Sequence, residues 1–562
     1  MSNLFRAGGL AGVMALAVLC SSAGAAGASD ADLKEYLDRH DPNYSEDVQM
    51  VGAAFKSSGY HSTVPSGTWV HSTRGSLDYA LALLKRNAPG DAERAAKVIR
   101  KVISLQDADP ANPTYGIWPY LLEEPLAKMA PPDWNWADFC GALLAEMLIQ
   151  HPAKLPDDLK ALMRTSLGHA ARAIIKRNVG PGYTNIAIMG GGVTAAAGEI
   201  LGDKEMLDYG RARLAKSVEN AARHGSFNEY NSPTYTMVAL REAERTLRLV
   251  RDPATREAAE SLRRTAWQII ADSFHPGTRQ WAGPHSRAYS DTITPKLAAD
   301  LAAQCPADLA PRFKALPADP LEIRRTFIRG DTPEKSVTGV TWYAADACLG
   351  TVNHAMLWTQ RRPLIAYWKV EGDEPAVLRL RFLHDGKDFS SMAVATAQAG
   401  GRALSAFYPL KGRGDWHPSL DRPKDGIFQA ADLRVRYELT AKGATAEALG
   451  GGRFAFAAGG RRAVVHTVSG RFNGRPVEWL LGKEGDAVFV DGICYRGEKK
   501  AFDFKNGPQV VLAAAVELLK SGEPPAAQPP ALTDEKPGAV AAAWDAGAGV
   551  KLSVSTAGLV GD

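Results

Sequence analysis

The hydrophobic pattern of the first half of the chain has a helical period. From about residue 30 to about residue 328, apolar residues recur at three- and four-residue spacing, as in SLDYALALLKRN (76–87), DAERAAKVIRKVISL (91–105) and YTMVALREAERTLRLV (235–250). This spacing predicts amphipathic helices. Short loops rich in Pro, Gly and Asp separate the helices, and successive antiparallel pairs predict an α/α solenoid or toroid.

From about Val337 the period shortens to two. Segments such as VTGVTWYAAD (337–346), VLRLRFLHD (377–385) and LRVRYELTA (433–441) are rich in β-branched and aromatic residues and are bounded by glycines. They predict short antiparallel strands that form a sandwich. The Pro-rich stretch 522–538 predicts a loop or linker. The fold class expected is therefore α+β, with an incomplete N-terminal α/α toroid (29–330) followed by an antiparallel β-sandwich (331–562).

The N-terminal segment 1–28 has the pattern of a secretory signal peptide. Arg6 provides the positive start, the stretch 10–19 is apolar, and Ala23-Gly24-Ala25 is a small-residue cleavage site. The apolar stretch is too short to span a bilayer. We therefore expect a periplasmic or secreted protein that has no membrane association after the signal is cleaved.

Composition narrows the function classes. The 562 residues carry a formal net charge of only +4 and no long basic run, so nucleic acid is not an expected partner. No phosphate-binding glycine loop or metal-ligand spacing stands out, and we expect neither a cofactor nor a metal. The cysteines after the signal are Cys140, Cys305, Cys348 and Cys494. Cys348 and Cys494 can form a disulfide in an oxidising compartment, or all four can be buried thiols.

Two polar junctions between predicted helices are candidate sites. GSFNEYNSPTYT (225–236) presents Glu229, Tyr230 and Tyr235 on a loop that leads into a helix. Helix capping explains the Ser-Pro of this motif, but it does not explain Glu229 together with Tyr235. The second junction, GPGYTNIAIMGGG (180–192), places Asn185 at a helix start, where an ordinary cap or a core amide is the alternative.

Three further segments contain candidate residues. In WAGPHSRAYSD (281–291), His285, Arg287 and Tyr289 alternate and so share one side of an extended segment. The loop 115–139 contains a possible wall for sugar rings, with core tryptophans as the alternative; its members are Trp118, Trp134, Asn135 and Trp136. His384 stands in HDGKDFSS (384–391), where a structural histidine is the alternative.

The order of these motifs resembles the heparinase II/III-like polysaccharide lyases, which have an α/α toroid followed by an antiparallel β-sandwich. Asn185 resembles the family's asparagine at a helix start, GSFNEYNSPTY its tyrosine motif, and His384 its early sandwich histidine. The sequence departs from the family pattern at Ile186 and Thr236, where the family has histidines, and Ser286-Arg287 is similar to the arginine of the related hyaluronate and chondroitin lyases.

The resemblance implies β-elimination on an acidic, uronate-containing polysaccharide. Asn185, with Arg287 or His285, would offset the uronate carboxylate. Tyr235 would act as base and acid, with His384 or His285 as a second proton-transfer group. Glu229 would orient the substrate.

Two alternatives stay open. A toroid glycoside hydrolase would need two carboxylates, and those available are Glu123, Glu124, Asp138, Glu229 and Asp291. A glycan-binding protein without catalysis would use the Trp loops alone.

Overall fold

The computed structural model describes residues 29–56, 61–316, 319–372, 374–410, 426–536 and 539–559. The predicted signal peptide therefore lies outside the described residues. Contacts divide the chain into two compact units. The first, called here the helical unit, comprises residues up to 222 together with 234–266. The second, the sheet unit, comprises 223–233 and everything from 267 onward.

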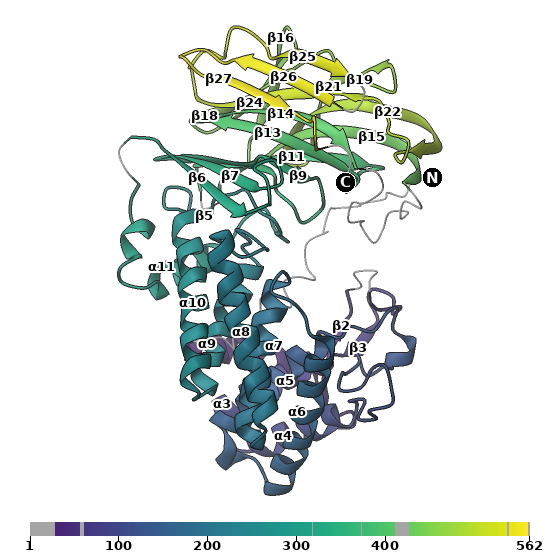
Figure 1. Ribbon diagram of the computed structural model, residues 1–562, viewed down its shortest axis with the longest axis vertical. Helices are drawn as coiled ribbons and strands as arrows, with labels where there is room; N and C mark the ends of the chain where they lie inside the picture. Colours follow the sequence, from purple (N-terminus) through teal and green to yellow (C-terminus); the bar gives the residue numbers. More distant parts are fainter. Residues whose placement is uncertain are drawn as a thin grey trace. The chain divides into compact units, whose positions relative to one another are not determined.

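The α-helices that the structure describes lie in the part of the chain that ends at Gln304 (Figure 1). Their bounds are α2 Asp30–His40, α3 Thr73–Arg86, α4 Asp91–Ile103, α5 Trp136–Gln150, α6 Asp157–Arg177, α7 Thr184–Leu201, α8 Lys204–His224, α9 Tyr235–Leu249, α10 Pro253–Ser273 and α11 Pro295–Gln304. Short 3-10 helices lie at Asp41–Asn43, Leu126–Lys128, Pro152–Lys154 and Ala310–Phe313.

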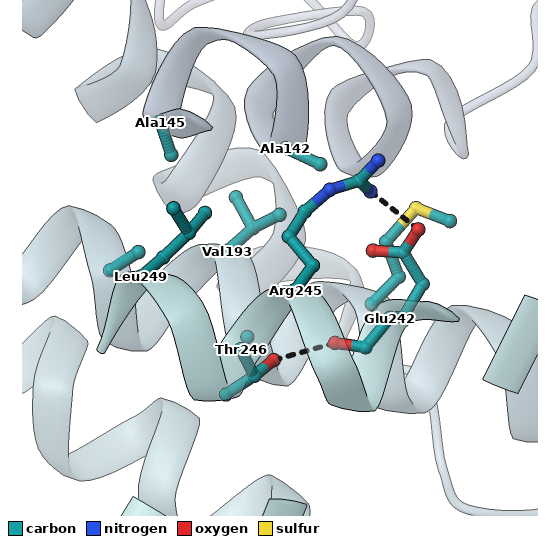
Figure 2. Close-up of a pocket in the computed structure, with 10 residues that line it drawn as sticks. Ala142, Ala145, Val193, Glu242, Arg245, Thr246 and Leu249 are labelled. Atoms are coloured by element: carbon teal, nitrogen blue, oxygen red, sulfur yellow. Dashed lines mark hydrogen bonds and ion pairs between the residues drawn. The ribbon is translucent and has the colours of Figure 1, made fainter. Parts of the chain in front are cut away.

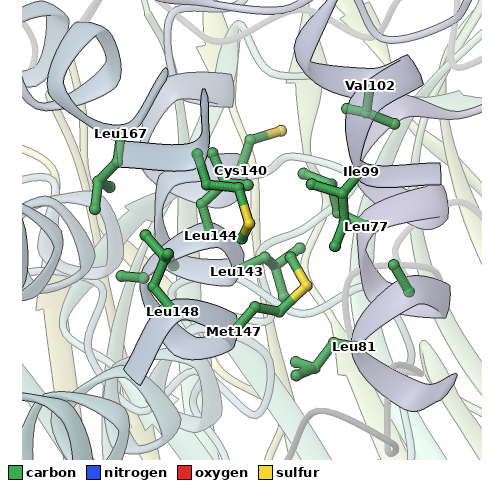
Figure 3. Packing of buried hydrophobic residues seen from close by; sticks show 14 of the residues in the cluster. Leu77, Leu81, Ile99, Val102, Cys140, Leu143, Leu144, Met147, Leu148 and Leu167 are labelled. Carbon is green, nitrogen blue, oxygen red and sulfur yellow. The ribbon is translucent and has the colours of Figure 1, made fainter. Parts of the chain in front are cut away.

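Alternate helices of the helical unit form an inner row. α3 packs on α5, α5 on α7 and α7 on α9, whereas α4 packs on α6 outside them. The interface between α3, α4 and α5 is filled by aliphatic side chains that recur every three or four residues, among them Leu77, Leu81, Ile99, Leu143 and Met147 (Figure 3). This is the double layer expected of an α/α toroid, and it arises because each helix buries one apolar stripe.

Glycines bring α7 close to three neighbouring helices. A Cβ on Gly190 would lie 2.4 Å from the Asp138 carboxylate of α5, and one on Gly191 would lie 2.8 Å from Leu214 of α8. On Gly192 it would lie 2.3 Å from the Thr246 hydroxyl of α9. The Gly190–Gly192 run therefore lowers helix propensity but permits a spacing that larger residues would prevent.

All paired strands are antiparallel. Their bounds are β1 Tyr44–Ser45, β2 Met50–Ala54, β3 Trp69–His71, β4 Phe274–His275, β5 Gln280–Trp281, β6 Leu321–Ile328, β7 Val337–Ala344, β8 Ala347–Val352, β9 His354–Met356, β10 Leu364–Trp368, β11 Ala376–His384, β12 Lys387–Asp388, β13 Met392–Ala399, β14 Arg402–Pro409, β15 Ile427–Thr440, β16 Thr445–Gly450, β17 Arg453–Ala458, β18 Arg461–Thr467, β19 Arg471–Phe472, β20 Arg475–Pro476, β21 Glu478–Glu484, β22 Ala487–Asp503, β23 Val510–Val511, β24 Ala513–Lys520, β25 Ala531–Lys536, β26 Ala539–Asp545 and β27 Lys551–Ser555.

Two large sheets form the sandwich of the sheet unit. One runs β21-β22-β15-β11-β10-β8-β7-β6, with β12 paired to β11, and the other runs β16-β17-β18-β24-β14-β13-β9. Leu378 and Val435 from the first sheet share one core with Phe407 and Val516 from the second. The predicted class, helices followed by an antiparallel sandwich, is confirmed.

A third, smaller sheet covers the outer face of the second. On β14, Ala403 and Phe407 face the main core, whereas Leu404 and Ala406 face Trp544 and its neighbours on β25–β27. Because successive strand residues point to opposite faces, a strand covered on both sides is expected to be apolar at most positions. This explains why β14 and β24 are mainly apolar, with Ser405 and Glu517 as buried polar exceptions.

Three details differ from the sequence-based expectation. The first strand of the sandwich is β6, which begins at Leu321, before the expected start near Val337. The stretch 522–538, expected to be a loop, contains β25, and β1–β3 form a small sheet among the helices.

The cysteines at 140, 305, 348 and 494 are free thiols. The domain boundary at 330/331 stays a prediction. No helix in the described ranges combines the length and apolar character that crossing a membrane requires.

Candidate active site

The topology of the helical unit places the candidate residues that belong to this unit at one end. Short connections, 87–90, 151–156, 202–203 and 250–252, follow the inner helices α3, α5, α7 and α9. The connections that precede α5 and α7, at 104–135 and 178–183, lie at the opposite end, as does Tyr235 at the start of α9. Each motif selected from the sequence in this region therefore leads into the N-terminus of an inner helix. Helix N-termini carry partial positive charge, which favours anions.

The register of these helices places Asn185 close to the level of Tyr235. Asp138 faces Gly190 and Gly141 faces Val193, so α5 and α7 run parallel. Gly192 of α7 faces Thr246 of α9. Asn185 lies seven residues before Gly192, and residue 239 lies seven residues before Thr246, so Asn185 is level with residue 239 of α9. Tyr235 is then four residues, or about 6 Å along the axis, towards the N-terminal end. Tyr235 is half-buried and begins α9, whereas Asn185 is 3% exposed in the first turn of α7.

Arg213 of α8 fixes the start of α7. Its guanidinium donates to the carbonyls of Ile186 (2.8 Å) and Ala187 (3.0 Å), the two residues that follow Asn185. It also lies 3.9 Å from the carboxylate of Asp138, whose pKa burial raises to about 7 although Arg213 opposes the shift. The sequence pattern did not single out Arg213, because an arginine in an amphipathic helix is ordinarily a surface residue.

An exposed aromatic and amide cluster lies beside the start of α7. Asn135 donates to the hydroxyl of Tyr183 (3.2 Å) and accepts from Arg177 (2.5 Å). Trp134 and Tyr183 are each 36% exposed, and the Trp134 indole donates to the Pro113 carbonyl. Ring faces beside amide and guanidinium donors can bind a sugar. Tyr183 and Arg177 were not predicted, although Tyr183 is only two residues from Asn185.

The other tryptophans of this segment are packed differently. Trp118 is completely buried, and its indole donates to the Val102 carbonyl. It therefore belongs to the core, the alternative considered for it, and cannot line a sugar subsite. Trp136 is half-buried, with its ring centroid 3.9 Å from that of Tyr120 and its indole bonded to Thr73.

Glu229 and Arg287 form an ion pair within the sheet unit. The Arg287 Nη1 lies 3.1 Å from the Glu229 carboxylate, and its Nε donates to Gln360 (3.0 Å). The guanidinium also lies 5.7 Å from the ring centre of Trp358, and the Ser232 hydroxyl donates to the Arg287 carbonyl. Arg287 is thus held by a carboxylate, an amide and a ring. Tyr289, two residues further on, is half-buried.

His285 and Tyr230 are enclosed in the sheet unit. His285 is 2% exposed and contacts the Asn231 carbonyl and the Tyr367 hydroxyl. Burial lowers its pKa to about 4, so it is neutral near pH 7 and is not the cation considered for the carboxylate. Tyr230 stacks on Phe327 at 4.5 Å in a hydrophobic cluster, and burial raises its pKa. These contacts favour structural roles for both residues.

His384 ends β11 and is 2% exposed. Its Nε2 donates to the Gln429 carbonyl at 2.8 Å, and its ring contacts Phe389 and Phe428. The catalytic role considered for His384 stays a prediction. Among the described residues no group of three or more His, Cys, Asp or Glu side chains is arranged to hold a metal.

Comparison with known proteins gives a family for less than half of the chain. A domain of unknown function, DUF8769, matches residues 44–305. No curated protein matches the sequence.

The chain is also similar to solved polysaccharide lyases. Chondroitin AC lyase from Streptomyces coelicolor A3 has 10% identity and a TM-score of 0.47, over 93% of this chain and 83% of that one. Heparan sulfate lyase HepC from Pedobacter heparinus has 8% identity and a TM-score of 0.40, over 86% and 82%. A heparinase III has 10% identity and a TM-score of 0.37, over 86% and 84%. The lyase group that the sequence motifs resemble is thus also represented among these structures.

Proposed function

We propose that this protein is an exported polysaccharide lyase that cleaves a uronic-acid-containing glycan by β-elimination and leaves an unsaturated uronate end. The observation that carries the proposal is the placement of Asn185 and Tyr235. They occupy the first turns of two parallel, adjacent inner helices, about one turn apart in level. An amide donor and a phenol near two helix N-termini suit a negatively charged sugar.

The reaction begins at the C5 proton of the uronate. Removing it builds negative charge next to the carboxylate, and this charge must be offset by donors that are already in place. In the proposal the Asn185 amide and the N-terminal turns of α7 and α9 supply these donors. Arg213 is a positioning residue, because it holds the carbonyls that follow Asn185.

Tyr235 is proposed as the group that moves the proton. Its phenolate would take the C5 proton, and the phenol formed would return a proton to the leaving O4 when both lie on one face of the sugar. When they lie on opposite faces, a second group is required, and His384 is the candidate. Arg287, oriented by Glu229, is the proposed cation for a substrate carboxylate. Trp134, Asn135 and Tyr183 are proposed to bind neighbouring sugar rings.

The test is to offer glucuronan, alginate, hyaluronan and heparan-type chains to the mature protein. A lyase produces a C4–C5 double bond that absorbs in the ultraviolet. Tyr235→Phe removes only one hydroxyl and should lower kcat at least about a hundredfold, the usual effect of losing a general acid–base group. Tyr44→Phe, whose hydroxyl lies 3.5 Å from Glu46, is the matched control and should keep full activity. A fully active Tyr235→Phe enzyme would refute the mechanism.

The hydrolase alternative is less well supported by the carboxylates available. Glu123 pairs with His71, Asp291 with Arg379 and Glu229 with Arg287. Glu124 accepts a hydrogen bond from the Thr63 hydroxyl. Glu124 and Asp138 are each only 1% exposed. An inverting or retaining hydrolase needs two carboxyl groups that reach the scissile bond. New reducing ends without ultraviolet absorbance would favour the hydrolase.

A further inference from the structure

A small pocket in the sheet unit is lined by arginines that the proposed reaction does not use. Its lining includes Arg361, Arg362, Arg379, Arg381 and Asp388, together with Trp358 and Leu357. These residues come from the loop before β10, from β11 and from β12. Four guanidinium groups around one hollow repel each other unless anions balance them.

Carboxylates balance three of the four arginines. Arg381 forms a two-point pair with Asp388 at 2.8 and 3.1 Å, and it also contacts Glu438. Arg379 bridges Glu438 and Asp291, and Asp291 also pairs with Arg362. The four guanidinium groups carry four positive charges, and the carboxylates of Asp291, Asp388 and Glu438 carry three negative charges. One positive charge is therefore not balanced.

That charge is on Arg361. Within the part of the chain that the structure describes, its guanidinium has no ion pair or hydrogen bond, and its Nε is buried without an acceptor. The indole N–H of Trp358, three residues earlier, is likewise buried without an acceptor. A buried donor that lacks an acceptor costs free energy, and the cost is larger for a charged group. Two such donors in one turn, at the edge of an arginine-lined hollow, point to an acceptor that comes from outside the chain.

The loop that carries these donors is joined to the segment of Arg287. The backbones of Arg362 and His285 exchange two hydrogen bonds, and Ala288 donates to the Gln360 carbonyl. The Gln360 side chain accepts from Arg287, whose guanidinium lies over the Trp358 ring. The two donors without an acceptor therefore belong to the same loop as the groups that contact Arg287. Trp358 is one of these groups, and Arg361 directly follows Gln360, the other.

We propose that Arg361 and Trp358 form a binding site for an oxyanion, the sulfate or carboxylate group of an acidic glycan. A tetrahedral or planar oxyanion accepts from a guanidinium and an indole N–H together, and such charge-assisted bonds are stronger than neutral ones. The identification of the glycan rests on the proposed function. The site itself rests on the charge balance and on the two unfilled donors.

Binding is measured in the Tyr235→Phe background, so that no probe is consumed. Titration calorimetry compares a sulfated heparan-type oligosaccharide with an unsulfated glucuronan oligosaccharide of equal length. Arg361→Gln should weaken binding about tenfold, the effect of losing one charge-assisted contact. Trp358→Phe keeps the ring below Arg287 but removes the N–H, and should weaken binding about threefold. Arg475→Gln, an exposed arginine on β20, makes the same change in net charge and should have less than a twofold effect.

The pattern of losses identifies the ligand group. A loss confined to the sulfated probe, with sodium sulfate as a competitor only when Arg361 is present, identifies a sulfate site. An equal loss for both probes identifies a carboxylate site. Unchanged affinity in Arg361→Gln, an equal loss in Arg475→Gln, or no binding of either probe overturns the proposal. If the wild-type protein yields no unsaturated product while the Arg361 effect persists, the lyase reaction fails and the oxyanion site stands.

Discussion

At the scale of single residues, burial separates candidates that the sequence could not separate. Trp118 and Trp134 belong to one tryptophan-rich segment, yet the first is completely buried and the second is 36% exposed. Residue type and spacing indicated that aromatic rings gather in this segment. Which ring faces solvent depends on the path of the connection 104–135, and no local pattern encodes that path.

His285 should make the stability of the sheet unit depend on pH. Its pKa is about 4 in the folded protein because of burial, against an ordinary value near 6.5. Below pH 6.5 the unfolded chain binds a proton that the folded chain does not, so stability should fall as the pH falls towards 4. The loss between pH 7 and pH 4.5 should be roughly 2 kcal/mol.

Urea unfolding at the two pH values measures this effect. His285→Gln removes the titrating group, so the difference between pH 7 and pH 4.5 should shrink by about the same amount, roughly 2 kcal/mol. The variant should also be less stable than the wild type at pH 7, because contacts with the Asn231 carbonyl and Tyr367 change. An identical pH dependence in both proteins would show that His285 is not held neutral by the fold.

At the scale of elements, the periodicity predicted the existence of the helices but not their registers. A glycine run such as Gly190–Gly192 permits close packing but does not identify the neighbouring helix. The neighbours, Asp138, Leu214 and Thr246, come from three different helices, two of which are not adjacent to α7 in the sequence. The separation of Asn185 and Tyr235 along the chain therefore does not give their positions in space, which depend on the register of α7 against α9. The strand β25 was missed because its segment is rich in proline, which usually disfavours strands.

Gly192→Ala should test the register of α7 against α9. Alanine favours a helix over glycine by about 1 kcal/mol, so an isolated helix would gain stability. Here the added Cβ would lie 2.3 Å from the Thr246 hydroxyl, and the helices would have to separate. We expect a net destabilisation of about 1–3 kcal/mol, measured by chemical unfolding, together with lower activity because Asn185 shifts relative to Tyr235.

Gly168→Ala in α6 is the matched control. An added Cβ there would lie 3.3 Å from the flexible end of the Arg172 side chain and 3.4 Å from Leu201, contacts that can adjust. This substitution should be neutral or should stabilise by a few tenths of a kcal/mol, since the gain in helix propensity remains. Equal behaviour of the two variants would contradict the close approach of α7 and α9.

A small cavity lies between α5, α7 and α9 (Figure 2). The charged side chains Glu242 and Arg245 of α9 border it. Arg245 pairs with Glu242 on the same helix and with Glu146 of α5, which also lies 3.4 Å from Lys85 of α3. Glu146 is 1% exposed, and these cations hold its pKa below the ordinary value although burial opposes the shift. The pairing joins three of the inner helices, and it explains why charged residues are found inside the double layer.

At the scale of the whole molecule, the order of structural classes was predictable and the number of layers was not. Alternation predicts strands, but it cannot assign them to a sheet. The small sheet β25–β27 adds a layer outside the sandwich, and the apolar runs of β14 and β24 were compatible with either two layers or three. Buried polar residues reveal this layer better than apolar ones, because they need specific partners.

The pair His466–Glu517 marks the contact between the second large sheet and this outer layer. Both side chains are completely buried, with His466 Nε2 and a Glu517 oxygen 2.8 Å apart. The same oxygen accepts from the backbone of Ala526, and the Trp544 ring centre lies 5.1 Å from that of His466. Because the pair is enclosed, removing one partner leaves the other without compensation.

Glu517→Ala should therefore destabilise the sheet unit by about 3 kcal/mol, since it leaves His466 and the Ala526 N–H without their acceptor. Chemical unfolding measures the loss, and limited proteolysis should cut first in the segment around Ala526, which loses its anchor to β24. Glu447→Ala, at an exposed position of β16, is the control and should change stability by less than about 0.5 kcal/mol. If both variants are equally stable, the outer sheet is held by its apolar contacts alone, and the buried pair contributes nothing to its attachment.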